Sequence, residues 1–196
     1  MLTLDKQIIA DVLLLARKAG VKILSYYKSD YQVNYKGDAS PLTEADLAAH
    51  HIIVHGLSTL TPDIPVLSEE SDIASQSQRL NWAEYWLVDP LDGTKEFIKK
   101  NGEFTVNIAL IRNGVPVFGV VYTPVPDVIY WGEVGKGAMK QTGADSPVAI
   151  KVAPLPLSEK GWRVVGSRSH QSERFTQFMQ CLPEAEIVPV GSSLKL

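Results

Sequence analysis

The most constraining feature of this sequence is a short apolar run that leads straight into two aspartates. Residues 85–88 are Tyr-Trp-Leu-Val, a compact run typical of a buried strand, and Asp89-Pro90-Leu91-Asp92-Gly93-Thr94 follows directly. Pro90 fixes φ, so we expect it to stop the strand and force a turn. Two carboxylates three residues apart, Asp89 and Asp92, can then converge on one point beside the turn.

This turn has the chemistry of a phosphate site that needs a cation. Gly93 permits close backbone approach, and a short helix expected over about 95–98 would point free N–H groups at the same place. Carboxylates alone would repel a phosphate, whereas a hard divalent cation between them would not. All-oxygen ligands without cysteine favour Mg²⁺ over zinc. The alternative is local: Asp92 as a helix N-cap and Asp89 as a turn residue.

A second acidic cluster ends another expected strand. Residues 65–67 lead into Ser68, Glu69 and Glu70. Two acidic strand ends that face one crevice would suit a two-metal phosphoryl-transfer site, with ions roughly 3.5–4 Å apart. A covalent aspartyl-phosphate mechanism fits poorly, because those enzymes space two aspartates two apart and the spacing here is three.

Composition excludes several other classes of protein. Of 196 residues, 45% are hydrophobic, and the net charge of −3 argues against a protein that neutralises many nucleic-acid phosphates. The one cysteine, Cys181, allows no internal disulfide and fits a reducing cytoplasm. Residues 1–19 mix charges into their apolar positions, so they lack the core of a signal peptide or a membrane span.

The periodicity of apolar residues predicts a chain of mixed helices and strands. Asn113-Gly114 between two apolar runs is a strong hairpin signal. We expect helices over about 5–27, 43–60, 95–98 and 173–181. We expect strands over about 65–67, 85–88, 104–111, 115–122, 128–134, 148–152, 164–165 and 186–190.

The expected elements divide the chain into two halves. Residues 1–147 form an α+β half with most of the acidic residues, and residues 148–196 begin a β-α-β half after a linker at Pro154 and Pro156. One strand–helix–strand unit is a poor closed domain. We therefore expect the C-terminal part of this half to be missing from the chain.

Four segments of the sequence resemble one family. Residues 67–70 (Leu-Ser-Glu-Glu) and 86–94 (Trp-Leu-Val-Asp-Pro-Leu-Asp-Gly-Thr) are similar to the two signature segments of the inositol monophosphatase superfamily. Residues 43–46 and 135–138 match two further elements in the same order. The resemblance implies the layered α/β/α/β/α sandwich of the sugar phosphatases.

The resemblance also implies a set of metal ligands. Glu69, Asp89 and the backbone carbonyl of Leu91 would hold one Mg²⁺, and Asp89 with Asp92 would hold a second, so that two or more ions are expected. Family members carry a further acidic ligand in a Trp-Asp motif beyond the point where this chain ends. The second ion should bind weakly without it.

Catalytic roles follow from the same resemblance. Thr94 and Glu69 would position the attacking water, Asp46 would orient the Thr94 hydroxyl, and the Gly93 and Thr94 amides would receive the phosphate. Asp46 has a local alternative, because Thr43-x-x-Asp46 has the spacing of a capping box at the start of a helix. The two roles do not exclude each other.

Three segments point to the 3'(2'),5'-bisphosphate nucleotidase branch of the superfamily. Lys95 and Glu96 stand where inositol phosphatases usually have another pattern, and His170 lies in a segment that contacts the nucleotide in that branch. Ser192 and Lys195 resemble the pair that holds the phosphate that is not cleaved. Three of these residues have simpler alternatives: His170 as a surface histidine, Ser192 as a helix N-cap and Lys195 as a solvated lysine.

The resemblance implies hydrolysis of 3'-phosphoadenosine 5'-phosphate, and of its phosphosulfate relative, by metal-activated water. AMP or adenylyl sulfate would be the product. It also implies a place in sulfate assimilation and inhibition by lithium. The alternatives are an inositol or other sugar phosphatase with the same site, and a non-catalytic fragment that binds magnesium or nucleotide.

We expect a small nucleotide as the partner, with no nucleic acid and no transmembrane segment. A cytoplasmic location is expected, with peripheral attachment to the inner face of the membrane left open. The sequence also leaves open whether the chain forms a homodimer.

Overall fold

The computed structural model describes residues 2–28, 33–35, 41–71, 79–156, 161–168 and 172–195. Its helices are α1 (Lys6–Tyr27), α2 (Glu44–Leu60), α4 (Thr94–Ile98) and α5 (Glu173–Gln180), with short 3-10 helices η1 (Arg79–Asn81) and η2 (Ser192–Lys195). Its strands are β1 (Val33–Tyr35), β2 (Pro41–Thr43), β3 (Val66–Ser68), β4 (Glu84–Asp92), β5 (Thr105–Arg112), β6 (Val115–Thr123), β7 (Val128–Glu133), β8 (Gly137–Thr142), β9 (Val148–Ile150), β10 (Arg163–Ser167) and β11 (Glu186–Val190).

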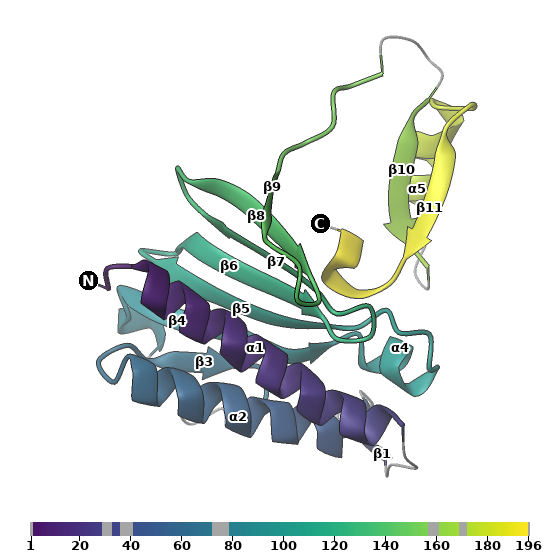
Figure 1. Ribbon diagram of the computed structural model, residues 1–196. Coiled ribbons are helices and arrows are strands. Elements are labelled where there is room, and N and C mark those ends of the chain that lie inside the picture. Colours follow the sequence, from purple (N-terminus) through teal and green to yellow (C-terminus); the bar gives the residue numbers. More distant parts are fainter. Residues whose placement is uncertain are drawn as a thin grey trace.

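A seven-stranded sheet in the order β3-β4-β5-β6-β7-β8-β9 forms the body of the protein. The β3–β4 pair is parallel and every other neighbouring pair is antiparallel. The hairpin predicted between β5 and β6 is confirmed, with Asn113 at φ 51° and Gly114 at φ 77°, as a tight two-residue turn requires. Helices α1 and α2 lie side by side across one face of the sheet (Figure 1).

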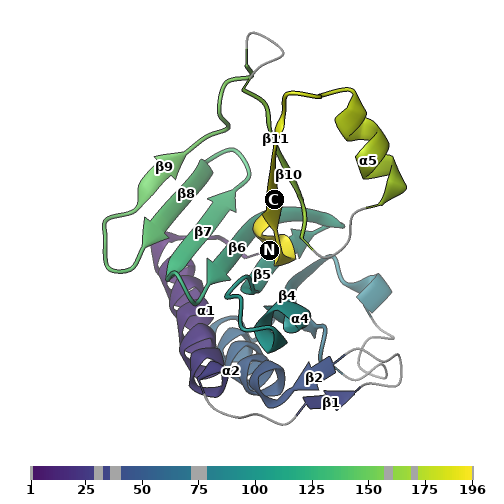
Figure 2. The same cartoon turned by 90° about the vertical axis from the view of Figure 1, so that its right-hand side faces the viewer.

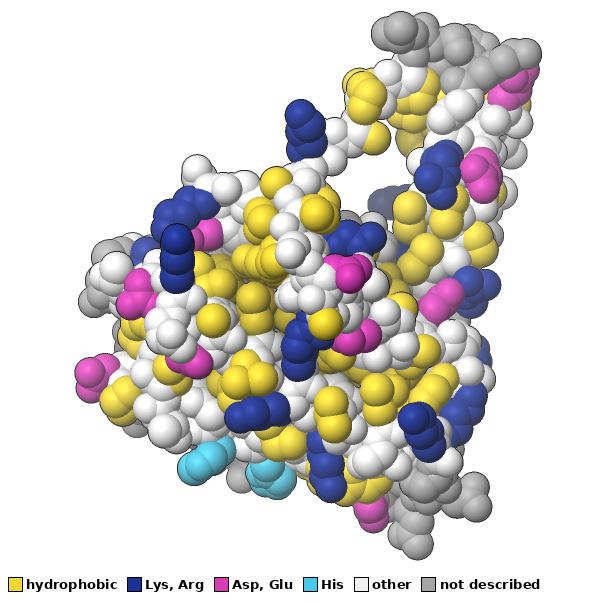
Figure 3. Space-filling model, viewed as in Figure 1, with side chains coloured by type: hydrophobic (Ala, Val, Ile, Leu, Met, Phe, Trp, Pro, Cys, Tyr) yellow, Lys and Arg dark blue, Asp and Glu magenta, His cyan; other side chains and the backbone are white. Residues whose placement is uncertain are grey.

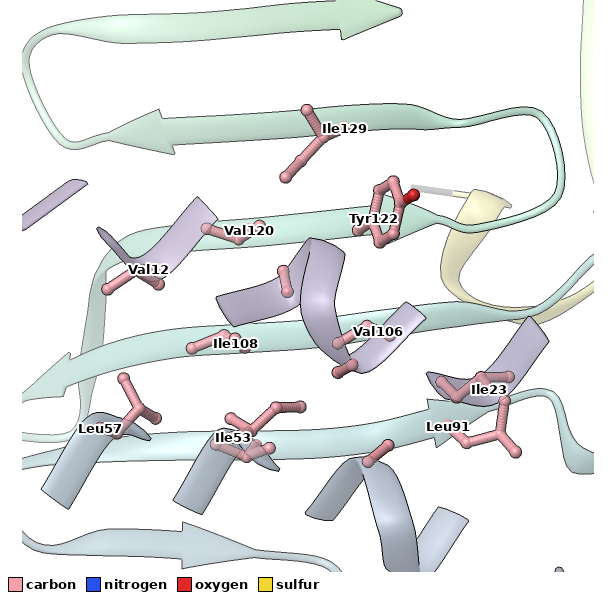
Figure 4. Close-up of a cluster of buried hydrophobic side chains, with 14 of the residues drawn as sticks. Val12, Ile23, Ile53, Leu57, Leu91, Val106, Ile108, Val120, Tyr122 and Ile129 are labelled. Atoms are coloured by element: carbon pink, nitrogen blue, oxygen red, sulfur yellow. The ribbon is translucent and has the colours of Figure 1, made fainter. Parts of the chain in front are cut away.

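The core lies between that helical layer and the sheet. Asp5 caps α1 through its side chain, which accepts a hydrogen bond from the Ile8 amide at 2.9 Å. Each helix then presents a stripe of small and branched residues spaced three or four apart, and these meet the apolar face of β4, β5 and β6 (Figure 4). The fully buried helical members are Val12, Ala16, Ala19, Ile23, Ala45, Ala49, Ile53 and Leu57.

A close helix–sheet approach fixes where α1 crosses the strands. A Cβ added to Gly20 would lie 2.3 Å from the ring of Tyr122 on β6, so glycine is what allows this contact. The Arg17 guanidinium pairs with Asp127, and Tyr122 donates to the same carboxylate at 2.9 Å. These contacts hold the helical layer in one register over the sheet.

The C-terminal residues form a small β-α-β unit. Strands β10 and β11 pair in parallel, α5 joins them, and residues 151–156 connect the unit to the sheet in an extended conformation (Figure 2). Open space separates this linker from the unit in the surface view (Figure 3). The β-α-β order predicted from the sequence is confirmed.

Two expectations about the strands need correction. Pro90 does not stop β4, which continues to Asp92; the missing N–H is accommodated at a bulge between Asp89 and Asp92. The segment 137–142 is a strand, β8, that the sequence pattern did not reveal. β8 pairs with β9, so the sheet extends past residue 147. The division into 1–147 and 148–196 stays a prediction, and this pairing favours residues 151–156 as the join.

None of the described helices combines the length and the apolar character needed to cross a membrane.

Candidate active site

Two carboxylates meet where the pairing between the parallel strands β3 and β4 ends. The Glu69 amide continues the pairing of these strands by donating to the Val88 carbonyl at 3.0 Å, which brings Glu69 level with Asp89. Both residues line one groove of about 600 Å³ on the sheet face opposite the helices. Ser68, immediately before Glu69, is buried and its hydroxyl lies 2.8 Å from His50 Nδ1 on α2. The end of β3 is therefore anchored to the helical layer.

Asp89 is electrostatically strained without a cation. Burial, followed by the nearby charges of Glu69 and Asp92, raises its pKa to about 7, although the Leu91 amide and the Asn107 side chain donate hydrogen bonds that oppose this change. Its Oδ1 atom is buried and has no hydrogen-bond partner within the described residues. A buried acceptor among like charges is stabilised by a positive ion, and this observation fits a hard metal.

The bulge in β4 turns Asp92 toward the C-terminal segment. Asp92 Oδ2 accepts hydrogen bonds from the Ser192 hydroxyl and the Ser193 amide, each at 2.5 Å. Asp92 also faces Thr105 on β5, whose hydroxyl lies 3.4 Å from the same oxygen. Helix α4 begins after Gly93, which sits at φ 91°. Asp92 is therefore not the N-cap of this helix, and that alternative is set aside.

The carboxylate and carbonyl oxygens of this site suit a hard cation, but the described side chains do not form a complete set of ligands. Across the residues that the structure describes, no group of three or more His, Cys, Asp and Glu side chains is arranged to hold a metal ion. Glu69 and Asp92 are close enough to raise the pKa of Asp89, and one oxygen of Asp92 is already engaged by serines. The Leu91 carbonyl accepts a hydrogen bond from the Thr94 hydroxyl at 3.3 Å. The assignment of these residues as ligands stays a prediction.

Asp46 lies buried at the start of α2, with 5% of its surface exposed. Helix α2 packs against β4, and Thr94 opens α4 two residues after β4 ends. The Asp46–Thr94 pair stays a prediction. The side chain of Thr43 lies outside the described residues, so the capping box is also not decided.

A second pocket of about 420 Å³ adjoins the first, and Ser193 lines both. The second pocket lies between α4 and the C-terminal segment. Its lining residues are Asp92, Gly93, Glu96, Ser167, Gly191, Ser192, Ser193 and Lys195. Four of the sequence-predicted residues, Asp92, Gly93, Ser192 and Lys195, thus meet in one pocket.

The remaining predicted substrate residues are Lys95 and His170. Lys95 is exposed on α4, whereas its neighbour Glu96 is buried and lines the pocket. His170 lies outside the described residues. The Lys195 ammonium donates to the Ser192 carbonyl and so folds back over its own segment.

Several residues of this site escaped the sequence-based prediction. Thr105 and Asn107 alternate on β5 and face the carboxylates, and both bind the Ser193 hydroxyl, at 2.8 and 3.0 Å. Their signal was present: two polar residues two apart on an otherwise apolar strand point to one face. Glu103 and Arg168 pair across the site, which no local pattern indicates.

The family profile of the inositol monophosphatases matches residues 4–195, and the chain belongs to this family. Members of the family generally depend on a metal ion. The family predicted from residues 67–70 and 86–94 is therefore confirmed.

Two bacterial proteins are similar in sequence to most of this chain. It is 51% identical over 183 residues to the 3'(2'),5'-bisphosphate nucleotidase CysQ of Salmonella typhimurium, covering 92% of this chain and 72% of that protein. It is 46% identical over 190 residues to the protein of the same name from Buchnera aphidicola, covering 92% of this chain and 67% of the other.

Solved structures agree on the fold. CysQ from Bacteroides thetaiotaomicron, a bacterial member of the inositol monophosphatase family, aligns with a TM-score of 0.75 at 40% identity, over 95% of this chain and 73% of the other. The extragenic suppressor protein suhB from Bartonella henselae aligns with a TM-score of 0.77 at 27% identity, over 96% and 72%. The predicted fold class, a layered arrangement of helices and a mixed sheet, is confirmed.

Proposed function

We propose that this chain is a magnesium-dependent 3'(2'),5'-bisphosphate nucleotidase that releases phosphate from 3'-phosphoadenosine 5'-phosphate. The observation that carries the proposal is Asp89: a half-buried carboxyl with a raised pKa and one buried, unpartnered oxygen, in one groove with Glu69 and adjoining a pocket that contains a lysine. Identity of 49–51% to proteins named as such nucleotidases supports the substrate class. The phosphosulfate relative of this nucleotide is the second expected substrate.

Residues of the first groove and of its junction with the second pocket would hold the metal. Glu69, Asp89 and Asp92 supply carboxylate oxygens, which Mg²⁺ prefers, and the Leu91 carbonyl supplies a further one. When bound, Mg²⁺ lowers the pKa of water and offsets negative charge on the phosphate. Asp89 would lose its proton on binding, because a cation favours the charged form of a carboxyl.

The other residues would position the two reactants. Thr94, at the start of α4, would orient the attacking water together with Glu69, and Asp46 would fix the direction of the Thr94 hydroxyl. The amides of Gly93, at φ 91°, and of Thr94, the first residue of α4, would donate hydrogen bonds to the phosphate that is cleaved. Holding water and phosphate in line removes much of the entropic cost of bringing them together.

The second pocket would hold the phosphate that is not cleaved. Ser192 and Lys195 line this pocket, and among its described lining residues Lys195 is the one with a positive charge. A lysine and a hydroxyl beside a phosphate form charge-assisted hydrogen bonds. A substrate with two phosphates would span both pockets, whereas an inositol monophosphate would use only the first.

Phosphate release by the defined chain tests this proposal. We would compare 3'-phosphoadenosine 5'-phosphate with inositol 1-phosphate, with Mg²⁺ and after its removal by EDTA. The Asp89→Asn variant should lose roughly 10³-fold in rate, since it removes a ligand at the reacting centre. Asp63→Asn, the same chemical change at an exposed turn after α2, is the matched control and should behave as wild type.

Each outcome separates one alternative. Preference for inositol 1-phosphate would exclude the nucleotidase and keep the family. Nucleotide binding without phosphate release, in wild type and variant alike, would favour a non-catalytic binding module. Lithium inhibition, a cytoplasmic location and a homodimer stay predictions that this experiment does not address.

A further inference from the structure

Glu103 lies where the sheet meets the C-terminal unit, immediately before Phe104 and β5. Its carboxylate accepts two hydrogen bonds from Arg168, from Nε at 2.8 Å and from Nη2 at 2.6 Å, and a third from the Gly191 amide at 2.8 Å. Arg168 also donates to the Pro189 carbonyl at 2.8 Å. The bidentate pair is directional, and it ties the end of β10 and the end of β11 to the sheet at one point.

The backbones around Glu103 approach closely. A Cβ added to Gly191 would lie 2.7 Å from Glu96 Cγ and 3.0 Å from Glu103 Oε2, and one added to Gly93 would lie 3.0 Å from Ser192 Cβ. Glycine at both positions therefore lets the C-terminal segment sit directly on α4 and Glu103. Any shift of Glu103 would be passed to this segment, because no spare volume separates them.

The segment held in this way is the one that carries the second pocket. Directly after Gly191, Ser192 adopts a left-handed backbone at φ 55°, which is unusual for a residue with a side chain. Its hydroxyl binds Asp92, and Lys195 folds back onto its carbonyl. Such a conformation persists only where the surroundings enforce it, and the hydrogen bond from the Gly191 amide to Glu103 lies one residue before it.

We propose that Glu103 is a positioning residue that, with Arg168, holds residues 191–195 in place to receive the uncleaved phosphate of the substrate. The inference rests on the proposed function. The charge arrangement agrees with it: hydrogen bonds from Arg168 hold the pKa of Glu103 below its usual range, and Arg168 offsets a carboxylate that would otherwise repel an anion beside the pocket.

Substrate comparison tests the role directly. 3'-phosphoadenosine 5'-phosphate and 3'-AMP share the phosphate that is cleaved and differ in the 5'-phosphate. Glu103→Ala and Arg168→Ala should each raise KM for the bisphosphate roughly tenfold, with kcat within about twofold, and leave 3'-AMP hydrolysis nearly unchanged. A misplaced phosphate ligand weakens binding of the group that it contacts, whereas general damage to the fold would affect both substrates.

Two further variants sharpen the result. Glu103→Gln keeps an acceptor for the Gly191 amide but loses the ion pair, so its KM should lie between wild type and Glu103→Ala. Arg163→Ala is the matched control, because Arg163 pairs with Glu186 at the opposite end of the same two strands and both side chains are exposed. It should leave both substrates unaffected.

Amide hydrogen exchange gives a readout that needs no turnover. Exchange at residues 191–195 should be faster in Glu103→Ala than in wild type, and unchanged in Arg163→Ala. Unchanged exchange in Glu103→Ala, or equal losses on both substrates, would overturn the inference. If wild type hydrolyses neither nucleotide, the proposed function fails, whereas exchange still decides whether Glu103 holds the segment.

Discussion

The helix-and-sheet body and the β10–α5–β11 unit differ in how they are held together. The body encloses large side chains with no exposed surface, among them Trp86, Phe97 and Phe104. In the smaller unit, α5 has no buried residue among those described, and Phe178 is 53% exposed. The body thus has a core of its own, while the unit has mainly its two-strand ladder and its contacts to the body.

This difference explains where the site lies. Catalytic carboxylates must be held rigidly, and β3, β4 and β5 supply such a frame. The C-terminal unit brings a serine and a lysine to that frame through Glu103 and Asp92. Under the proposed function, the chemistry would depend on the body, and recognition of the second phosphate would depend on how the unit is joined to it.

Truncation of one apolar side chain in each region tests the contrast in packing. Ile53→Ala should lower the free energy of unfolding by about 2–5 kcal/mol, because the side chain is fully buried between α2 and the sheet. Phe178→Ala, a larger deletion on α5, should change it by less than about 0.5 kcal/mol. Urea denaturation of both variants measures the difference. A comparable loss in Phe178→Ala would mean that α5 is buried in solution.

The pH dependence of stability tests whether the pKa of Asp89 is raised in the folded body. A carboxyl with a pKa of 3.8 when unfolded and about 7 when folded stays protonated up to a higher pH in the folded state. Stability of the metal-free protein should therefore fall as pH rises from about 4 to about 7, then level off. Relative to wild type, Asp89→Asn should gain about 2–3 kcal/mol between pH 5 and pH 8, because wild type loses about 1.4 kcal/mol for each step of one in pH between the two pKa values.

Thermal unfolding in EDTA across this pH range measures the effect. With Mg²⁺ added, wild type should become more stable than Asp89→Asn, because the ion binds folded wild type and the variant has lost one of its ligands. Parallel pH profiles for wild type and Asp89→Asn without metal would contradict the raised pKa.

The sequence was most informative where a pattern is local. The 3.6-residue period of α1 and α2, the Asn113-Gly114 turn and the acidic end of β3 all predicted what the structure shows, because each depends on residues close in the chain. The family resemblance added roles that spacing alone left open. The bulge at Pro90 was missed because proline usually ends a central strand, and here pairing resumes at Asp92 and Thr105.

Contacts between distant segments could not be predicted in this way. Glu103 meets Arg168 sixty-five residues later, and Asp92 meets Ser192 a hundred residues later. Nothing in the sequence near either residue specifies its partner, because the pairing depends on where the linker delivers the C-terminal unit. Strand β8, with Lys140 and Gln141 among its residues, lacks the apolar alternation that marks a buried strand.

Glycine substitution tests the join between the two regions. Gly191→Ala places a methyl group against Glu96 and Glu103, so it should displace residues 191–195 and raise KM for 3'-phosphoadenosine 5'-phosphate roughly tenfold. Arg163→Ala is the control, since its exposed side chain pairs with Glu186 at the opposite end of β10 and β11. Steady-state kinetics of both variants would show the contrast. Equal KM values would mean that the close approach at Gly191 is not needed for substrate binding.

The smallest expected contrast compares two ion pairs. Arg112 on β5 pairs with Glu84 at 2.6 Å with its side chain 22% exposed, and it also donates to the Leu2 carbonyl at 2.8 Å. Arg163 pairs with Glu186 at 3.3 Å with both side chains about two-thirds exposed. Arg112→Ala should cost about 1–2 kcal/mol of unfolding free energy, because it removes the two hydrogen bonds that Arg112 donates to the partly buried Glu84 carboxylate. Arg163→Ala should cost at most about 0.5 kcal/mol, and that cost should vanish in 1 M NaCl, where exposed charges are screened within about 3 Å. Equal costs for the two variants would show that the C-terminal unit relies on surface charge pairs to the same degree as the body, and the contrast between a packed region and a tethered one would then be wrong.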